Sequence, residues 1–424
     1  MHNRIINISL FLIPALALGF PGGYWLGVLI YSVIGIAMIA RRQVRFADSI
    51  QLIKAVPMIW GFSIFVVLHI VLTIYHHEPA KDFGNVLPFI LSPLILLVVT
   101  QGNPNPRYFW LGCASGALLA FLIAVVQVYF LDVGRAFGFA NPITFGDTAI
   151  ILGTGAFIGL FYCRSIFQST VSRAYLLAGG LAGIITSLLS GSKGGWLSVI
   201  MVILLLANAA LRSLPIFKRL AIISGILIAL ALFASVVPKL PVVDRVISAY
   251  HGAKTWVQTG QITEGSASIR LEAFKAGLLA GAHSPILGLG RQGQLEVIQA
   301  AVNAGLVDKV MIEKQIVGDK YVYSTFSIDN DLINLFSRQG ILGVLGAFAV
   351  HLGVFFTFWR YRNDSTDAIK AIATFGILLV LLYFEFGLSI SVFGVSIFRT
   401  MHASWAILLA GLLINEKRRL ASLS

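Results

Sequence analysis

Charged residues are scarce in this chain of 424 residues. Asp, Glu, Lys and Arg together make up 12% of it, whereas hydrophobic residues make up 58% and the mean hydropathy is +0.88. Soluble domains carry about 25% charged residues, so the composition excludes an ordinary soluble protein. Because a helix satisfies its own backbone hydrogen bonds inside a bilayer, we expect an all-α integral membrane protein.

Cysteine is nearly absent as well. Cys113 and Cys163 both fall in or at the end of apolar runs, which excludes a disulfide framework and a cysteine-based metal site. The eight histidines lack metal-ligand spacing apart from the adjacent pair His76 and His77, and no Gly-x-Ser-x-Gly motif of an α/β-hydrolase is present. We therefore expect neither a metal nor a cofactor.

About twelve apolar segments run along the chain, and a helix needs about 20 apolar residues to cross a bilayer. They lie at 5–20, 23–40, 55–75, 84–100, 108–131, 146–163, 174–190, 194–211, 218–237, 339–359, 368–386 and 398–415. One long interval interrupts the series between the ninth and tenth segments. The predicted organisation is nine spans in 1–237, an insertion at 238–328 and three spans in 329–424.

Positive charges gather in alternate loops. Under the positive-inside rule these loops are cytoplasmic, and they hold Arg41, Arg42, Arg45, Lys54, Arg107, Arg164, Arg173, Arg212, Lys218, Arg219, Arg360, Arg362, Lys370, Lys417, Arg418 and Arg419. Both termini are then cytoplasmic, and the insertion lies on the other side. The net charge of +13 is distributed over loops, a pattern that favours membrane lipids over nucleic acid as the partner.

The insertion is expected to contain two amphipathic helices at the membrane interface. The segment Ser268–Ala282 places Ile269, Ala273 and Ala276 along one face. A second pattern with helical spacing extends from about Gln294 to Val317.

Two cations, one in an earlier outer turn and one inside the insertion, are candidates for binding an anion. Lys193 lies in the turn Ser190–Trp196, rich in Gly and Ser, on the side that carries few charges; the alternative is a hairpin turn whose lysine reaches the lipid headgroups. Arg270 opens the first interfacial helix, where an arginine suits phosphate; the alternative is a solvated arginine paired with Glu272 or a headgroup.

Arg291 follows the turn-rich segment 285–290. The composition of this segment favours a structural turn over a nucleotide-binding loop.

Acidic and polar residues mark the return to the membrane. Asp329 could act as a general base or could cap the tenth helix, and Asn330 follows it. Further candidates for substrate contacts lie at other outer turns: Arg135, Asn141, Asp147 and Arg399.

Together these features resemble the O-antigen ligase family, within the superfamily that also contains O-antigen polymerases. The resemblance rests on the series of spans and on 138–147 (GFANPITFGD), 190–196, 266–276, 285–290 and 329–343. It implies a GT-C-type architecture and a metal-independent inverting glycosyltransferase of the inner membrane of Gram-negative bacteria. Such a ligase moves a glycan from undecaprenyl pyrophosphate to lipid A-core on the periplasmic side.

The resemblance also implies roles for individual residues. Lys193, where the family usually has arginine, and Arg270 would hold the donor pyrophosphate. Arg291 is a further candidate for binding this pyrophosphate. Asp329 stands where the family usually has the histidine that deprotonates the acceptor, and an aspartate is ordinarily the weaker base. A polymerase, a ligase for another acceptor and a polysaccharide or lipid transporter are the alternatives.

Overall fold

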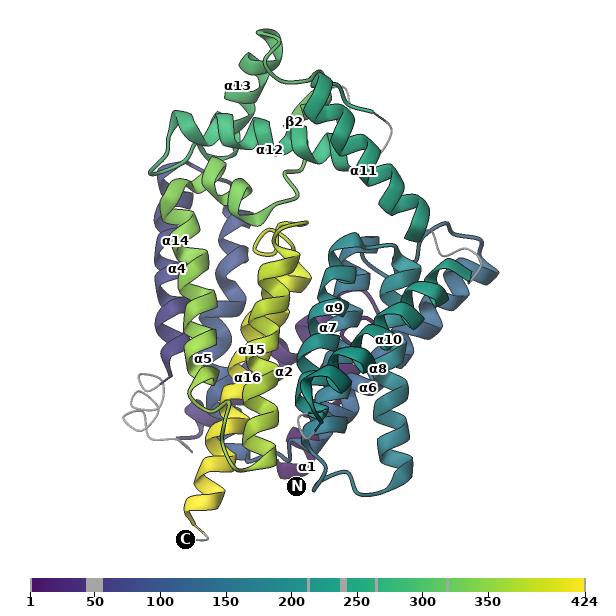
Figure 1. The fold of residues 1–424 in the computed structure, drawn as a ribbon. Helices are drawn as coiled ribbons and strands as arrows, with labels where there is room; N and C mark the ends of the chain where they lie inside the picture. Colours follow the sequence, from purple (N-terminus) through teal and green to yellow (C-terminus); the bar gives the residue numbers. More distant parts are fainter. Residues whose placement is uncertain are drawn as a thin grey trace.

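The computed structural model describes residues 2–42, 56–211, 214–236, 242–263, 266–317 and 320–422. Helices dominate the described chain, and most of them run side by side in one bundle (Figure 1). The elements before the insertion are α1 (His2–Ala15), η1 (Gly23–Trp25), α2 (Leu26–Ala40), α4 (Pro57–Tyr75), η2 (Ala80–Val86), α5 (Leu87–Gly102), α6 (Arg107–Val125), the π-helical turn η3 (Val126–Phe130), α7 (Pro142–Tyr162), α8 (Thr170–Ser190), α9 (Lys193–Ala210) and α10 (Ile216–Val236).

After the insertion the chain returns through three long helices. They are α14 (Asp331–Trp359), α15 (Asp367–Phe386) and α16 (Ser396–Ala421). Each of the twelve predicted spans overlaps one of the bundle helices. Within the described residues, nine helices are long and apolar enough to cross a membrane, and the apolar stretches of α1 and α9 are shorter. The protein is therefore a mainly helical, multi-pass membrane protein with one short hairpin in its insertion, whereas the count of twelve spans stays a prediction.

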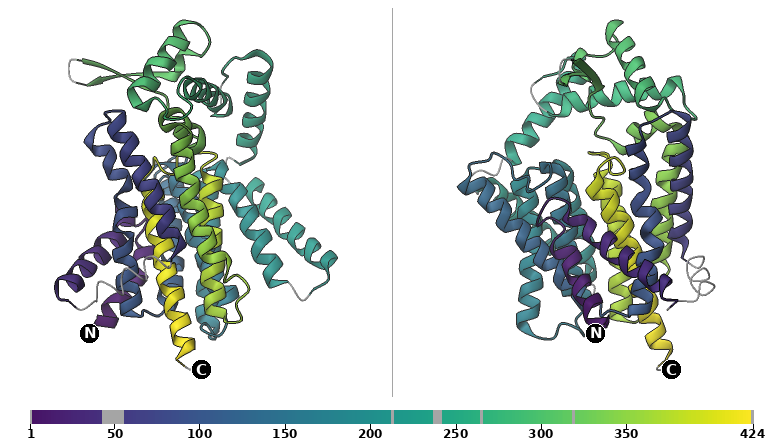
Figure 2. Two further views of the ribbon diagram at one scale, coloured as in Figure 1. Left: turned by 90° about the vertical axis from the view of Figure 1, so that its left-hand side faces the viewer. Right: turned by 180° about the vertical axis from the view of Figure 1, so that it is seen from behind.

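Both termini lie at the end of the bundle opposite the insertion (Figure 1). The two further views show the same separation, with the insertion at one end of the helices (Figure 2). This arrangement agrees with an even number of crossings between the termini. The assignment of the insertion to the periplasmic side stays a prediction.

The insertion contains α11 (Val242–Thr259), α12 (Ser266–His283), α13 (Gly290–Asn303), η4 (Lys309–Met311), β1 (Ile312–Val317) and β2 (Lys320–Thr325). It has its own apolar cluster, built around Ala273, Ala276, Ala280 and Ile298, apart from the core of the bundle. In Figure 1, α12 crosses over the ends of the bundle helices between α11 and α13.

The prediction of the second helix of the insertion was wrong over the second half of its length. The helix expected from Gln294 to Val317 ends at Asn303, and Gly305 adopts a φ of 72° that a helix does not allow. From Ile312 the chain forms a strand that pairs antiparallel with β2, with Ile312 opposite Thr325. The second strand, KYVYST, is rich in β-branched and aromatic residues, which favour strands.

A break in α14 attaches the insertion to the bundle. Gly340 lies inside α14 with φ 63° and ψ −163°, and a Cβ at this position would lie 2.2 Å from the carbonyl oxygen of Ile286. The backbone N–H groups beyond the break donate to the insertion instead: Ile341 to Pro285 at 2.8 Å and Leu342 to Ile286 at 3.4 Å. The segment 285–290 is therefore a structural turn, as its composition favoured.

Close backbone contact holds α4 against α14. A Cβ at Gly61 would lie 2.1 Å from the carbonyl oxygen of Ala349, so the two helices approach as closely as glycine permits. Membrane helices depend on such small residues because lipid provides no hydrophobic force between them.

We expect Gly61→Ala to destabilise the protein by about 1–3 kcal/mol, because the added methyl group forces the two backbones apart. The measurement is the thermal unfolding midpoint in detergent. Gly225→Ala on α10 is the control, since a Cβ there meets nothing within 4 Å and alanine favours a helix by about 1 kcal/mol. Equal midpoints for wild type and Gly61→Ala would contradict the packing.

Candidate functional site

The first turn of α12 meets the segment that leads into α14. Nη2 of Arg270 lies 3.7 Å from Oδ2 of Asp329, and these side chains are 22% and 25% exposed. The Ser327 hydroxyl donates to the other carboxylate oxygen of Asp329 at 2.9 Å. Two predicted site residues, 59 positions apart in the sequence, thus form one partly accessible pair.

The cap of α14 is Asn330, the neighbour of Asp329. The side-chain oxygen of Asn330 accepts from the N–H of Ile333 at 3.0 Å, which is the bond expected of an N-cap. The Asp329 carboxylate has no such role among the described contacts, because its partners are Arg270 and Ser327. The alternative that Asp329 caps the tenth helix is therefore wrong.

Asp331 has different partners although it is only two residues away. One of its carboxylate oxygens accepts from the Ser391 hydroxyl at 3.0 Å and from the N–H of Phe393 at 3.2 Å. This buried carboxylate fastens the loop between α15 and α16 to the start of α14. Asp329 and Asp331 thus contact different parts of the structure.

The structural alternative for Arg270 was an ion pair with Glu272. Glu272 is occupied otherwise: Trp256 donates to it at 2.7 Å, the N–H of Asp308 donates at 2.9 Å, and Lys275 lies 3.5 Å away. Glu272 therefore holds α11, α12 and the η4 turn together. Arg270 turns toward Asp329 instead.

Lys193 is the first residue of α9, and its side chain lies outside the described residues. The start of α9 borders the buried carboxylate of Asp147, which accepts from the Ser192 hydroxyl at 2.7 Å. A Cβ at Gly195 would lie 2.8 Å from Oδ1 of Asp147. The glycine thus admits the carboxylate to the positive end of the helix.

A second carboxylate faces α9 one turn later. Ser198 donates a hydrogen bond to Glu385 of α15, and Glu385 is 9% exposed. The sequence places this glutamate at the end of an apolar span, which is a signal for function or for a buried contact. Asp147 and Glu385 together hold α9 between α7 and α15.

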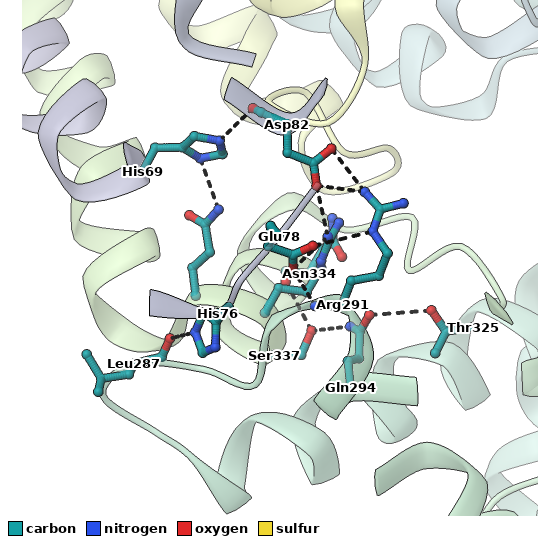
Figure 3. Close-up of polar contacts among 12 residues, drawn as sticks. His69, His76, Glu78, Asp82, Leu287, Arg291, Gln294, Thr325, Asn334 and Ser337 are labelled. Carbon is teal, nitrogen blue, oxygen red and sulfur yellow. Dashed lines mark hydrogen bonds and ion pairs between the residues drawn. The ribbon is translucent and has the colours of Figure 1, made fainter. Parts of the chain in front are cut away.

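Arg291 pairs with two carboxylates from the N-terminal part of the sequence (Figure 3). Its Nη2 donates to both oxygens of Asp82 at 3.1 and 2.9 Å, and its Nε lies 3.6 Å from Glu78. Arg338 of α14 also pairs with Glu78, at 3.4 Å. These four residues form a charge-balanced network, and we call it the α13–η2 network. It fastens the start of α13 to the segment between α4 and α5.

Sequence reasoning did not predict Glu78, Asp82 and Arg338 in this network. The only signal for the two carboxylates is a mixture of charges in the outer loop after the third span, and Arg338 lies just before the predicted tenth span. The carboxylates lie more than 200 residues before Arg291 and Arg338, so their pairing needs the three-dimensional structure.

Three other predicted candidates make local backbone contacts. Arg135 donates to the carbonyl oxygens of Ser190 and Gly191 at the end of α8, at 2.9 and 3.3 Å. Asn141 caps α7 by accepting from Thr144 at 2.8 Å. Arg399 donates to the carbonyl of Gly394 at 2.7 Å in the loop before α16. Each orders the outer turn in which it lies.

Comparison with known proteins finds a similarity in the central part of the chain. Residues 178–348 match the model of a family described as O-antigen ligase. The resemblance to the O-antigen ligase family is thereby confirmed. The matched segment includes Lys193, Arg270 and Asp329. An uncharacterized protein of Haemophilus influenzae is 23% identical over 376 residues, which cover 88% of this chain and 88% of that protein.

We expect Arg291→Gln and Asp82→Asn each to lower the unfolding midpoint slightly, and the double variant to lose little more than either one. The coupling energy should reach at most about 1 kcal/mol, because Arg291 is 50% exposed and solvent screens its ion pair. Arg291→Gln combined with Asp364→Asn, in the loop before α15, is the additive control. Fully additive losses for Arg291 and Asp82 would show that the pair contributes nothing.

Proposed function

We propose that this protein transfers a glycan from undecaprenyl pyrophosphate to the lipid A-core of lipopolysaccharide, at the periplasmic face of the inner membrane of a Gram-negative bacterium. The observation that carries this proposal is the contact between Arg270 and Asp329. It brings a cation suited to phosphate beside a carboxylate suited to accept a proton. The family match over the segment that holds both residues supports it.

The donor side of the reaction needs positive charge. When the bond from the sugar to the pyrophosphate breaks, negative charge grows on the departing phosphate oxygen. Arg270 can hold that phosphate through its planar guanidinium, and Lys193 at the positive end of α9 adds a second cation. With these two cations to balance its charge, undecaprenyl pyrophosphate can leave without a metal ion.

The acceptor side needs a base. In a single in-line displacement, the acceptor hydroxyl oxygen forms a bond to the anomeric carbon while the bond to the pyrophosphate oxygen breaks on the opposite face. The configuration of the sugar therefore inverts. The hydroxyl proton passes to Asp329, and the bonding electron pair leaves with the pyrophosphate. Ser327 and Arg270 orient the carboxylate for this transfer.

A polymerase would use the same donor chemistry with another lipid-linked glycan as acceptor, so the choice of acceptor distinguishes the two activities. An assay with lipid A-core in one reaction and a second lipid-pyrophosphate glycan in another tests both. Product that forms only with lipid A-core supports a ligase.

Arg270→Ala should reduce glycan transfer at least about 100-fold, because it removes a donor that stabilises the leaving charge. The reaction is run with purified protein in the presence of EDTA. Lys275→Ala on the same helix is the matched control, since this lysine is 45% exposed and pairs with Glu272. A full rate in Arg270→Ala, or no transfer by the wild type, would refute the proposal.

Asp329→Asn should lower transfer by about 10²–10⁴-fold with an unfolding free energy within about 1 kcal/mol of wild type, because the carboxylate is a base and not a cap. Asn330→Ala should show the opposite pattern, with about 1 kcal/mol lost from stability. Asp308→Asn in the insertion is the control, since asparagine can keep that turn's side-chain bond to Val310. Normal transfer by Asp329→Asn would assign the proton to another residue.

A further inference from the structure

A pocket lies beside the Asp329 segment, between α13, β2 and the start of α14. Its volume is about 280 Å³, close to the lower end of the roughly 300–1,000 Å³ of ligand pockets. The lining residues come from α13, from β2 with the segment that follows it, and from the start of α14. They are Arg291, Gln292, Gln294, Leu295, Tyr323, Ser324, Thr325, Phe326, Ser327, Ile328, Asn334 and Arg338. Ser327, one of these residues, is also the hydroxyl that binds Asp329.

The lining is rich in groups that both donate and accept hydrogen bonds. Three amide side chains and four hydroxyls, the tyrosine hydroxyl included, line the pocket, and an amide offers two N–H donors beside a carbonyl acceptor. Some of them are held in place: Gln294, which is 3% exposed, donates to Ser337 at 2.6 Å and accepts from Thr325 at 3.4 Å (Figure 3). A rigid set of donors and acceptors suits a ligand that carries several hydroxyl groups.

An aromatic side chain completes this pocket. Tyr323 on β2 is 48% exposed and lines the pocket, and Phe326 follows it after the strand. The face of an aromatic ring carries partial negative charge, and the C–H bonds of one face of a sugar ring carry partial positive charge. A sugar ring therefore packs well against the face of a tyrosine ring.

The charges in the pocket are already balanced. Arg291 and Arg338 both line it, but each pairs with carboxylates of the α13–η2 network. A phosphate or carboxylate on the ligand would compete with Glu78 and Asp82 for these guanidinium groups. An uncharged ligand makes no such demand.

We propose that this pocket binds an uncharged sugar unit of one of the two glycan substrates and so positions the glycan relative to Asp329. This inference rests on the proposed function, because that function brings saccharide into the site. Either the transferred glycan or the sugars of the acceptor can supply the unit. The two sources share the same chemistry, and the probes in the experiment separate them.

The test is saturation-transfer NMR on the full chain in detergent, with two soluble probes. One is the glycan released by mild acid from the lipid pyrophosphate, and the other is acceptor core oligosaccharide freed of lipid and phosphate. Tyr323→Ala and Gln292→Ala should each weaken binding at least about 10-fold. Tyr250→Ala on α11 is the matched control, since this tyrosine is also exposed in the insertion but lies outside the pocket.

The pocket is supported if the affinity for a probe falls in Tyr323→Ala, persists in Tyr250→Ala and changes little between low and high salt. The probe that behaves in this way identifies the source of the sugar. Binding of neither probe, or binding that survives in both pocket variants, overturns it. The transfer assay is independent of this result. A wild type that transfers glycan without binding a probe refutes the pocket alone, whereas one that binds a probe without transferring glycan refutes the ligase function alone.

Discussion

A break in a membrane helix leaves backbone groups without partners, and a bilayer offers no water to replace them. In this protein the break at Gly340 is satisfied by the insertion, whose carbonyl groups at Pro285 and Ile286 accept from the N–H groups of the next turn. The turn that provides these carbonyls directly follows α12. Consequently the insertion has a defined position over the bundle, and the contact between Arg270 and Asp329 depends on that position.

The helical bundle could be predicted from the sequence because its signal is local. A run of about 20 apolar residues can hardly be anything other than a buried or membrane helix, and each predicted span overlaps a helix. The hairpin at 312–325 could not be predicted in the same way. Its first strand, IEKQIV, continues an apolar pattern that also fits a helix, and only its pairing with β2 decides between the two.

In the candidate site, too, the residues with a local signal could be predicted and the contacts between distant segments could not. Lys193 and Asp329 were recognisable as candidates because charge is rare beside apolar spans, and Arg270 because it opens an amphipathic helix of the insertion. The α13–η2 network was not, since Arg291 meets carboxylates that the fold brings from a distant loop. A cap can shift by one residue without changing the composition of a segment, so the sequence alone could not assign capping to Asn330 over Asp329.

The capping bond of Asn330 has a consequence for how such a site can evolve. The residue that starts α14 and the residue that faces Arg270 are neighbours, but their tasks are divided between two side chains. Position 329 can therefore exchange its side chain while the helix keeps its beginning. A single side chain that both started the helix and contacted Arg270 could not be exchanged in this way.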